Sequence, residues 1–250
     1  MSLTLSELLT SFISRWSPLW GVTQWLDVAE QVMPPVLQTH FKRESQHLPP
    51  FAGLWQYAAT TTHEESIFAI QASLLVMTHS LLDDVTKRLV SFSMETDLRP
   101  WVSRVVSKDQ GKFSLGDVLS KEKQSMISEA SKRYQTYTER LSLPKRISLL
   151  NEIFRPGTSF IGETLNVLTD SDVKELDETR HGIVHGELLG KPFPRFKLFC
   201  ANTEDTILFL SLACARFHQI DLSDNSILAM HRQMQELVTQ NIARTRVPSA

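Results

Sequence analysis

The sequence predicts an all-α fold, a multi-helix bundle built around one long core helix. Apolar residues recur at intervals of three and four through most of the chain, which is the period of an amphipathic helix. Alternating strand patterns are scarce. Of the 250 residues, 42% are apolar and 22% are charged, the composition of an ordinary globular protein. A chain of this length can bury a core as one large domain or as two small ones.

The first 50 residues are predicted to form an N-terminal helical segment, followed by a main helical domain over residues 51–250. Apolar spacing indicates a helix over residues 3–16. Pro18 and Gly21 are expected to end this helix, because proline removes a backbone donor and glycine is a poor helix former. A second helix is expected over about residues 22–33, before the next two prolines.

Three tryptophans, Trp16, Trp20 and Trp25, fall within ten residues of this segment. A small apolar core or a docking surface is the favoured interpretation. A patch that stacks on bases or binds a partner is the alternative. Residues 46–50 are expected to join the segment to the main domain.

The clearest helix is expected to begin at Thr62. Glu65 follows three residues later, which is the pattern of a capping box. The helix is expected to end near Asp97. Asp83 and Asp84 lie in its middle, where a solvated face is favoured over carboxylates aimed at a functional site. The apolar residues that define this core helix are Ile67, Ile70, Leu74, Met77, Leu81, Val85, Leu89 and Phe92.

The middle of the chain is expected to continue with further helices. Residues 101–106 are prone to form a strand, and residues 108–112 are predicted to form a turn. A polar helix is expected over residues 115–141, where lysine and arginine alternate with glutamate. This pattern indicates a charge-balanced exposed face rather than a track for an anionic polymer.

Ser142 is predicted to cap the next helix, with Pro144 in its first turn, where the missing N–H costs little. This helix is expected to end at residues 155–157, and a short helix is expected over about residues 160–168. Residues 169–171 can then cap a helix that begins near residue 172.

Gly186 is well placed to end that helix. Residues 190–200 contain two prolines and are expected to form a loop or a short extended segment. Two final helices are expected over about residues 203–219 and 223–243.

Charge and cysteine content narrow the classes of function. The net charge is −2, so no overall basic field indicates nucleic-acid binding, although a local basic patch is compatible with it. Cys200 and Cys214 have no metal-binding or redox spacing, and are expected to be small buried residues in a reducing compartment. The N-terminus lacks the cationic start of a secretory signal. The most apolar runs, residues 67–82 and 207–215, are too short or too interrupted to span a bilayer, so a cytoplasmic location is expected.

Residues 177–186 carry the densest group of chemically active side chains. They read Asp-Glu-Thr-Arg-His-Gly-Ile-Val-His-Gly. Arg180 and His185 are five residues apart, about 140° around a helix, and are expected to flank a common groove. Arginine keeps its positive charge, whereas histidine exchanges protons near neutral pH. This pairing suits phosphodiester cleavage without a metal, because Arg180 can stabilise charge on the phosphate while His185 acts as acid or base.

The string RHGIVHG over residues 180–186 resembles the motif of the HEPN superfamily of ribonucleases. That motif is an arginine and a histidine separated by four to six residues, with a polar residue commonly after the arginine. Arg180, His181 and His185 match these positions, and Gly186 matches the glycine that follows. The resemblance is sharp over residues 171–186, loose over the preceding long helices, and absent over the first 50 residues.

The resemblance implies a homodimer whose cleft brings together two copies of the motif, each at the C-terminal end of a helix. It implies a metal-independent endoribonuclease that cuts single-stranded RNA by 2′-hydroxyl attack, leaves 2′,3′-cyclic phosphate ends and needs no cofactor. Arg180 and His185 would be catalytic, and His181 would help to position the phosphate. Such proteins act as toxins or antiviral-defence effectors, so an antitoxin or regulatory partner is possible. One branch has a tyrosine where this chain has Glu187, so regulation by nucleotidylation there is not supported.

Three other interpretations stay open for this motif. Arg180 could form a surface salt bridge with Asp177 or Glu178. His181 and His185 have the i, i+4 spacing of a zinc-ligand pair, although Gly182 stands where the HExxH motif has its glutamate. The chain could also be a non-catalytic, HEPN-like dimerisation or binding module.

A basic and aromatic stretch follows the motif. Lys191, Arg195 and Lys197 alternate with Phe193 and Phe196, and could bind RNA through phosphate contacts and base stacking. A structural turn with buried phenylalanines is favoured, because the two prolines of this stretch already explain an ordered loop.

Overall fold

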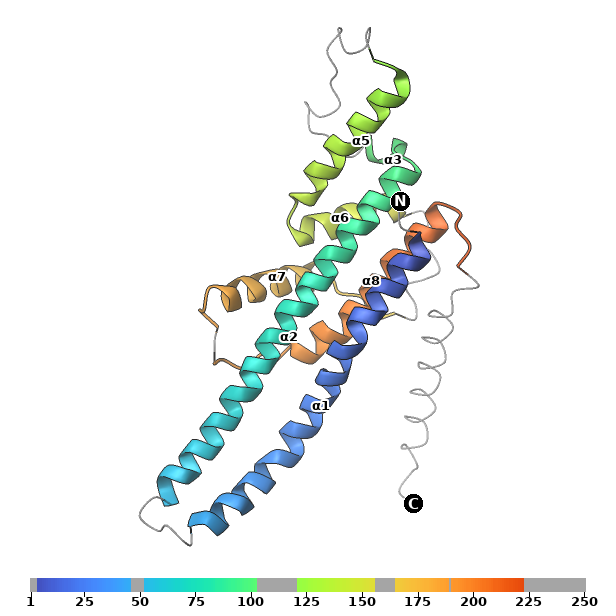
Figure 1. The fold of residues 1–250 in the computed structure, drawn as a ribbon. Helices are drawn as coiled ribbons and strands as arrows, with labels where there is room; N and C mark the ends of the chain where they lie inside the picture. Colours follow the sequence, from blue (N-terminus) through green and yellow to red (C-terminus); the bar gives the residue numbers. More distant parts are fainter. Residues whose placement is uncertain (1–3, 46–51, 103–120, 156–164, 189, 223–250) are drawn as a thin grey trace.

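The computed structural model describes residues 4–45, 52–102, 121–155, 165–188 and 190–222. Within these ranges the chain forms seven α-helices and no strand, which confirms the all-α prediction. The helices form one bundle, in which α2 contacts α1, α5, α6, α7 and α8. The long core helix predicted from the sequence is therefore the centre of the fold (Figure 1).

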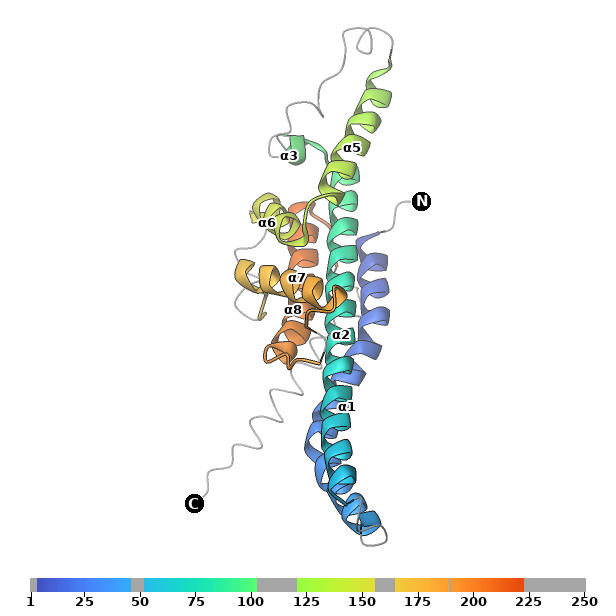
Figure 2. The ribbon, with the colours of Figure 1, turned by 90° about the vertical axis from the view of Figure 1, so that its left-hand side faces the viewer.

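Two long helices form the frame of the molecule. Helix α1 spans Leu5–Ser45, and α2 spans Ala52–Thr96. They run antiparallel and side by side, and α8 packs against both (Figures 1 and 2). Apolar side chains of α1 belong to the same core as those of α2 and α8, so the N-terminal segment shares the core of the main domain.

The shorter helices pack along this frame. In Figure 1, α5, α6 and α7 all lie on the left of α2, with α6 between the other two. Helix α6 also contacts α7 and α8. The shorter helices are α3 (Arg99–Val102), α5 (Lys123–Glu139), α6 (Leu143–Phe154), α7 (Asp170–Val184) and α8 (Phe196–Phe217).

The predicted breaks in the N-terminal segment are wrong, because α1 continues through Pro18, Gly21 and the Pro34–Pro35 pair. A proline inside a helix costs about 3 kcal/mol. Leu19 and Leu26 are 8% and 0% exposed on the same helix, and burial of each leucine contributes about 1.5–3 kcal/mol. Packing against α2 and α8 thus offsets the local cost.

The predicted tryptophan cluster divides between core and surface. Trp16 is buried, and Trp20 is partly buried and packs against the same core. Trp25 is 56% exposed. The first two rings thus belong to the main core of the bundle rather than to a small separate core. The predicted joint at residues 46–50 lies outside the described residues.

Helix α2 begins ten residues before the predicted start, so the expected capping box at Thr62 lies inside the helix. Its end at Thr96 agrees with the prediction. The start of the strand-prone run expected at residues 101–106 is helical instead. Trp101 lies in α3, and its indole N–H donates to Ser93 Oγ at 3.0 Å. Residues 103–120, which include the predicted turn and the predicted start of α5, lie outside the described part of the chain.

Helix α6 follows the sequence prediction closely. Ser142 occupies the N-cap position, although its side chain makes no capping hydrogen bond, Pro144 lies in the first turn, and the helix ends at Phe154. The predicted short helix before α7 is wrong where the structure describes it, because residues 165–168 are not helical. Helix α8 begins at Phe196, earlier than predicted, and the last predicted helix lies beyond the described residues.

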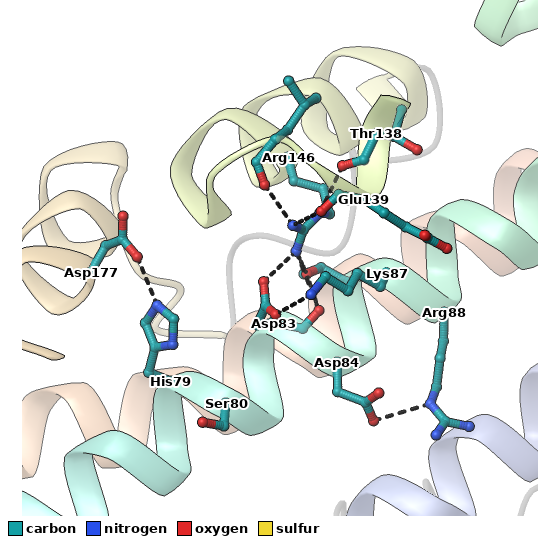
Figure 3. A network of polar contacts seen from close by, with 12 residues as sticks. His79, Ser80, Asp83, Asp84, Lys87, Arg88, Thr138, Glu139, Arg146 and Asp177 are labelled. Atoms are coloured by element: carbon teal, nitrogen blue, oxygen red, sulfur yellow. Dashed lines mark hydrogen bonds and ion pairs between the residues drawn. The ribbon is translucent and has the colours of Figure 1, made fainter. Parts of the chain in front are cut away.

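A buried arginine fastens α5 and α6 to α2. Arg146 on α6 is 1% exposed and donates to Asp83 Oδ1 at 2.6 Å. It also donates to the carbonyl oxygens of Thr138, Glu139 and Leu141 at 3.2, 3.3 and 2.7 Å. Figure 3 shows this side chain between the end of α5 and the middle of α2. A cation at this position satisfies carbonyls that a helix end leaves without partners.

Among the residues that the structure describes, two helices are long and apolar enough to cross a membrane, judged by length and composition alone. They are the His63–Thr96 part of α2, and α8. Within their apolar windows, 50% and 61% of the residues are buried inside the protein. Core helices of soluble proteins pass the same test, so this is weak evidence for a membrane span.

Candidate functional site

The helix that carries the RHGIVHG motif begins with a capping box. Thr169 Oγ1 accepts a hydrogen bond from the Asp172 amide at 3.2 Å, and the Thr169 amide donates to Asp172 Oδ2 at 2.9 Å. Burial raises the pKa of Asp172, but hydrogen bonds from Thr169 and Arg195 outweigh this and hold the pKa below its ordinary value. Helix α7 therefore starts at Asp170, close to the predicted position, with an acidic residue where the helix dipole favours one.

The C-terminal end of α7 is closed by Gly186, as predicted. Gly186 has φ +80°, a left-handed conformation that glycine adopts without strain. Its amide donates to the Ile183 carbonyl at 3.0 Å, and the Glu187 amide donates to the Gly182 carbonyl at 2.9 Å. These two bonds make a Schellman motif. The motif residues thus lie at a helix end fixed by its backbone.

Arg180 lies on the inward face of α7. On the helix it falls between Val173 and Leu176, which are both buried. The side chain is half-buried, and its Nε atom is covered without any hydrogen-bond partner. Within the described residues the guanidinium forms no ion pair, so its positive charge is not neutralised there.

His181 and His185 form an exposed pair at the end of the same helix. Their ring centroids are 4.2 Å apart, and the ring planes are inclined by 50°. The i, i+4 spacing puts the two rings in contact on one face of the helix end. In Figure 1 this end of α7 lies at the left edge of the molecule.

The nearby carboxylates are paired with other side chains. Asp177 Oδ1 lies 2.8 Å from His79 Nε2, which is nearly buried on α2 (Figure 3). Glu178 lies 3.7 Å from Lys174 on the exposed face. The surface salt bridge between Arg180 and either carboxylate is therefore not present in the structure.

The other acidic residues left open by the sequence are not bonded to the motif. Asp83 pairs with Arg146 and Lys87, and Asp84 pairs with Arg15 and Arg88. Both aspartates are only partly exposed, so they form ion pairs between helices rather than a fully solvated face. Glu64 is exposed on α2.

The basic and aromatic stretch after the motif has a structural role. The Arg195 guanidinium is bound by the carboxylates of Asp172 and Glu175, which raise its pKa, and it lies 5.2 Å from the centroid of the Phe199 ring. Phe196 is buried, and Phe193 packs against the core. The expected burial of the phenylalanines agrees with the structure, but Phe196 lies at the start of α8 rather than in a turn. Lys191 and Lys197, the other two residues predicted to bind RNA, are exposed.

The zinc interpretation finds no third ligand in the part of the chain that is described. No group of three or more histidine, cysteine or acidic side chains in that part has the arrangement of a metal site. Burial keeps both cysteines protonated, since it raises the pKa of Cys200 to about 11 and that of Cys214 to about 12.

Sequence reasoning missed two buried ionisable residues that position the helices. His79 lies within the apolar run of α2, and Arg146 lies at a core position of α6 beside Ile147. The sequence could have indicated both residues, because an ionisable side chain at an otherwise apolar position of a helix needs a buried partner. The partners themselves, 98 residues away for His79 and 63 for Arg146, could not be read from the sequence.

No protein-family model matches the chain, and no curated protein or solved structure matches it either. The chemistry available at the end of α7 is therefore inferred from its own side chains. It offers a guanidinium without a counter-charge in the described residues, and two exposed imidazoles. These groups are chemically suited to bind an anion and to transfer protons.

Proposed function

We propose that this protein is a metal-independent endoribonuclease of the HEPN type that cuts single-stranded RNA. The observation that carries the proposal is the charge arrangement on α7. Asp177 is paired with His79, and Glu178 lies nearest Lys174, so Arg180 keeps its charge for an anion. A phosphate is an anion that a guanidinium and imidazoles on the same helix are suited to bind.

In the proposed reaction, the RNA 2′-oxygen attacks the adjacent phosphorus and the bond to the 5′-oxygen breaks. His185 accepts the 2′-hydroxyl proton or donates a proton to the leaving 5′-oxygen. Arg180 stabilises the charge that develops on the phosphate oxygens, and His181 helps to position the phosphate. The products are a 2′,3′-cyclic phosphate and a 5′-hydroxyl.

A second copy of the motif completes the proposed site. His181 and His185 touch and act from one side of the phosphate, so the opposite proton transfer needs another group. A homodimer with two α7 ends facing one cleft supplies it. We propose that this dimer acts in the cytoplasm, without a cofactor, as a toxin or an antiviral-defence effector that an antitoxin or other partner can regulate.

The decisive experiment is RNA cleavage in excess EDTA. Wild-type protein is expected to cut single-stranded RNA and to leave cyclic phosphate ends, detected by mass spectrometry of the products. His185→Ala is expected to lower the rate by at least 100-fold, because it removes a proton-transfer group. Unchanged cleavage by this variant would remove His185 from the mechanism, and activity lost to EDTA would favour a metal site.

His63→Ala is the matched control, because it makes the same substitution at another histidine. His63 lies 16 residues before His79 on α2, about 24 Å along the helix from the contact with α7. It is expected to cleave like wild type. Circular dichroism and sedimentation velocity should show the same helix content and oligomeric state for all three proteins.

A non-catalytic dimerisation or binding module is the alternative function. Val184 favours it, because this apolar side chain, one residue before His185, is 52% exposed. An exposed apolar residue at a fixed helix end suits a protein interface. A binding module would form the same dimer but would cut no RNA under any condition.

A further inference from the structure

A hollow of about 450 Å³ lies against one face of α5. Its lining residues occupy two neighbouring rows along the helix, each with i, i+4 spacing. Together they form a strip about 16 Å long. The lining residues are Glu129, Lys132, Arg133, Thr136, Tyr137 and Arg140.

The strip has a local excess of positive charge. It contains three cations and one carboxylate, whereas the whole chain has a net charge of −2. Glu129 is bound by Lys121 at 2.7 Å and by Arg133, and hydrogen bonds from these two cations hold its pKa below the ordinary value. The side chains of Lys132 and Arg140 form no hydrogen bond or ion pair within the described ranges.

An aromatic ring lies among these cations. Tyr137 is half-buried and packs against the apolar core, so its ring has a fixed position. The Thr136 hydroxyl donates to the Lys132 carbonyl at 2.9 Å, which leaves its oxygen free to accept a hydrogen bond. Cations for the backbone, with a fixed ring for a base, are the means by which proteins bind single-stranded nucleic acid.

We infer that this α5 strip binds a nucleotide unit of single-stranded RNA. Lys132 and Arg140 contact phosphates, Arg133 adds positive charge, and the Tyr137 ring stacks on a base. Helix α6 separates α5 from α7 on the same side of α2 (Figures 1 and 2), so the strip is a binding surface distinct from the motif. Binding here does not require cleavage at α7, and the inference therefore goes beyond the proposed function.

The test measures RNA binding by the full-length His185→Ala protein, so that cleavage does not interfere. Fluorescence anisotropy with a labelled single-stranded RNA oligonucleotide gives the affinity at several salt concentrations. Adding Lys132→Gln and Arg140→Gln is expected to weaken binding at least tenfold. The slope of log affinity against log salt is expected to fall by about 1.4, or 0.7 for each lost phosphate contact.

Two sets of control variants distinguish an effect of the strip from a general loss of positive charge and from misfolding. Lys123→Gln with Lys145→Gln removes the same charge from exposed positions outside the strip, and is expected to leave affinity and salt slope unchanged. Tyr137→Phe keeps a ring and should bind like the parent, whereas Tyr137→Leu should weaken binding. Circular dichroism establishes that each variant is folded.

Equal affinity of the strip variant and its charge control would overturn the inference, as would absence of RNA binding by the parent. Competition by anionic vesicles or an acidic peptide as effective as that by RNA would also overturn it, because the surface would then bind any polyanion. Wild-type cleavage is assayed separately. An inactive wild type whose RNA binding depends on the strip would refute the proposed nuclease and support this inference.

Discussion

Gly182, inside the RHGIVHG motif, is required by packing rather than by its backbone angles. A Cβ atom at this position would lie 2.8 Å from Leu188 Cδ1 and 2.9 Å from Leu188 Cγ. Leu188 therefore covers the helix just before its end, and holds the following segment against α7. Gly182, which stands where a zinc-binding HExxH motif has its glutamate, instead allows this close approach.

Gly182→Ala is expected to destabilise the protein by about 1–2 kcal/mol, because the added methyl group forces Leu188 to move. Gly21→Ala is the matched control: Gly21 also lies inside a helix, but nothing is within 4 Å of its added Cβ. It is expected to stabilise the protein by about 0.5–1 kcal/mol through helix propensity. Urea denaturation measures both changes, and a loss of stability in both variants would contradict the packing argument.

At the scale of single helices, local signals predicted α7 well and α1 poorly. The capping residue Thr169 and the terminal Gly186 act within a few residues of the chain, so the sequence indicates both ends of α7. Pro18 signals a break just as locally, yet burial of α1 against α2 and α8 overrides it. Arg180 and His185 could likewise be recognised from the local sequence alone. The pairing of Asp177 with His79, which leaves Arg180 without a counter-charge in the described chain, depends on a contact across 98 residues.

The ion pair between α6 and α2 predicts a pH dependence of stability. Burial raises the pKa of Asp83, but hydrogen bonds from Arg146 and Lys87 outweigh burial, so the folded-state pKa lies below that of the unfolded chain. A group of this kind stabilises the fold above its unfolded pKa, about 3.9 for aspartate, and loses this contribution as the pH falls through the folded pKa.

Asp83→Asn is therefore expected to cost on the order of 3 kcal/mol at pH 7, because it leaves the buried Arg146 cation without its counter-charge. The difference from wild type should shrink as the pH falls below about 4. Urea denaturation between pH 3 and 7 measures it. Glu64→Gln, an exposed change on the same helix, should show little difference at any pH. A difference for Asp83→Asn that is constant with pH would show that its charge is not the cause.

At the scale of the whole molecule, α8 connects the long helical pair to the rest of the core. It packs against α1, α2 and α6, and most of its side chains are buried. Cys200 and Cys214 are 1% and 0% exposed on this helix, which confirms that they are small buried residues. Their thiols can be reached by solvent only when α8 separates from its neighbours, so they report on opening of the entire bundle.

Thiol labelling at pH 8 is expected to be very slow in the native protein. The two pKa values, about 11 and 12, leave little reactive thiolate, and the sulfur atoms are covered. Labelling then follows the population of open molecules, which rises about tenfold for each 1.4 kcal/mol of lost stability. Asp83→Asn should therefore label about 100-fold faster than wild type, and Gly21→Ala should label more slowly. Mass spectrometry after timed exposure to iodoacetamide measures these rates, and native labelling as fast as in urea would show that α8 is not packed in the core.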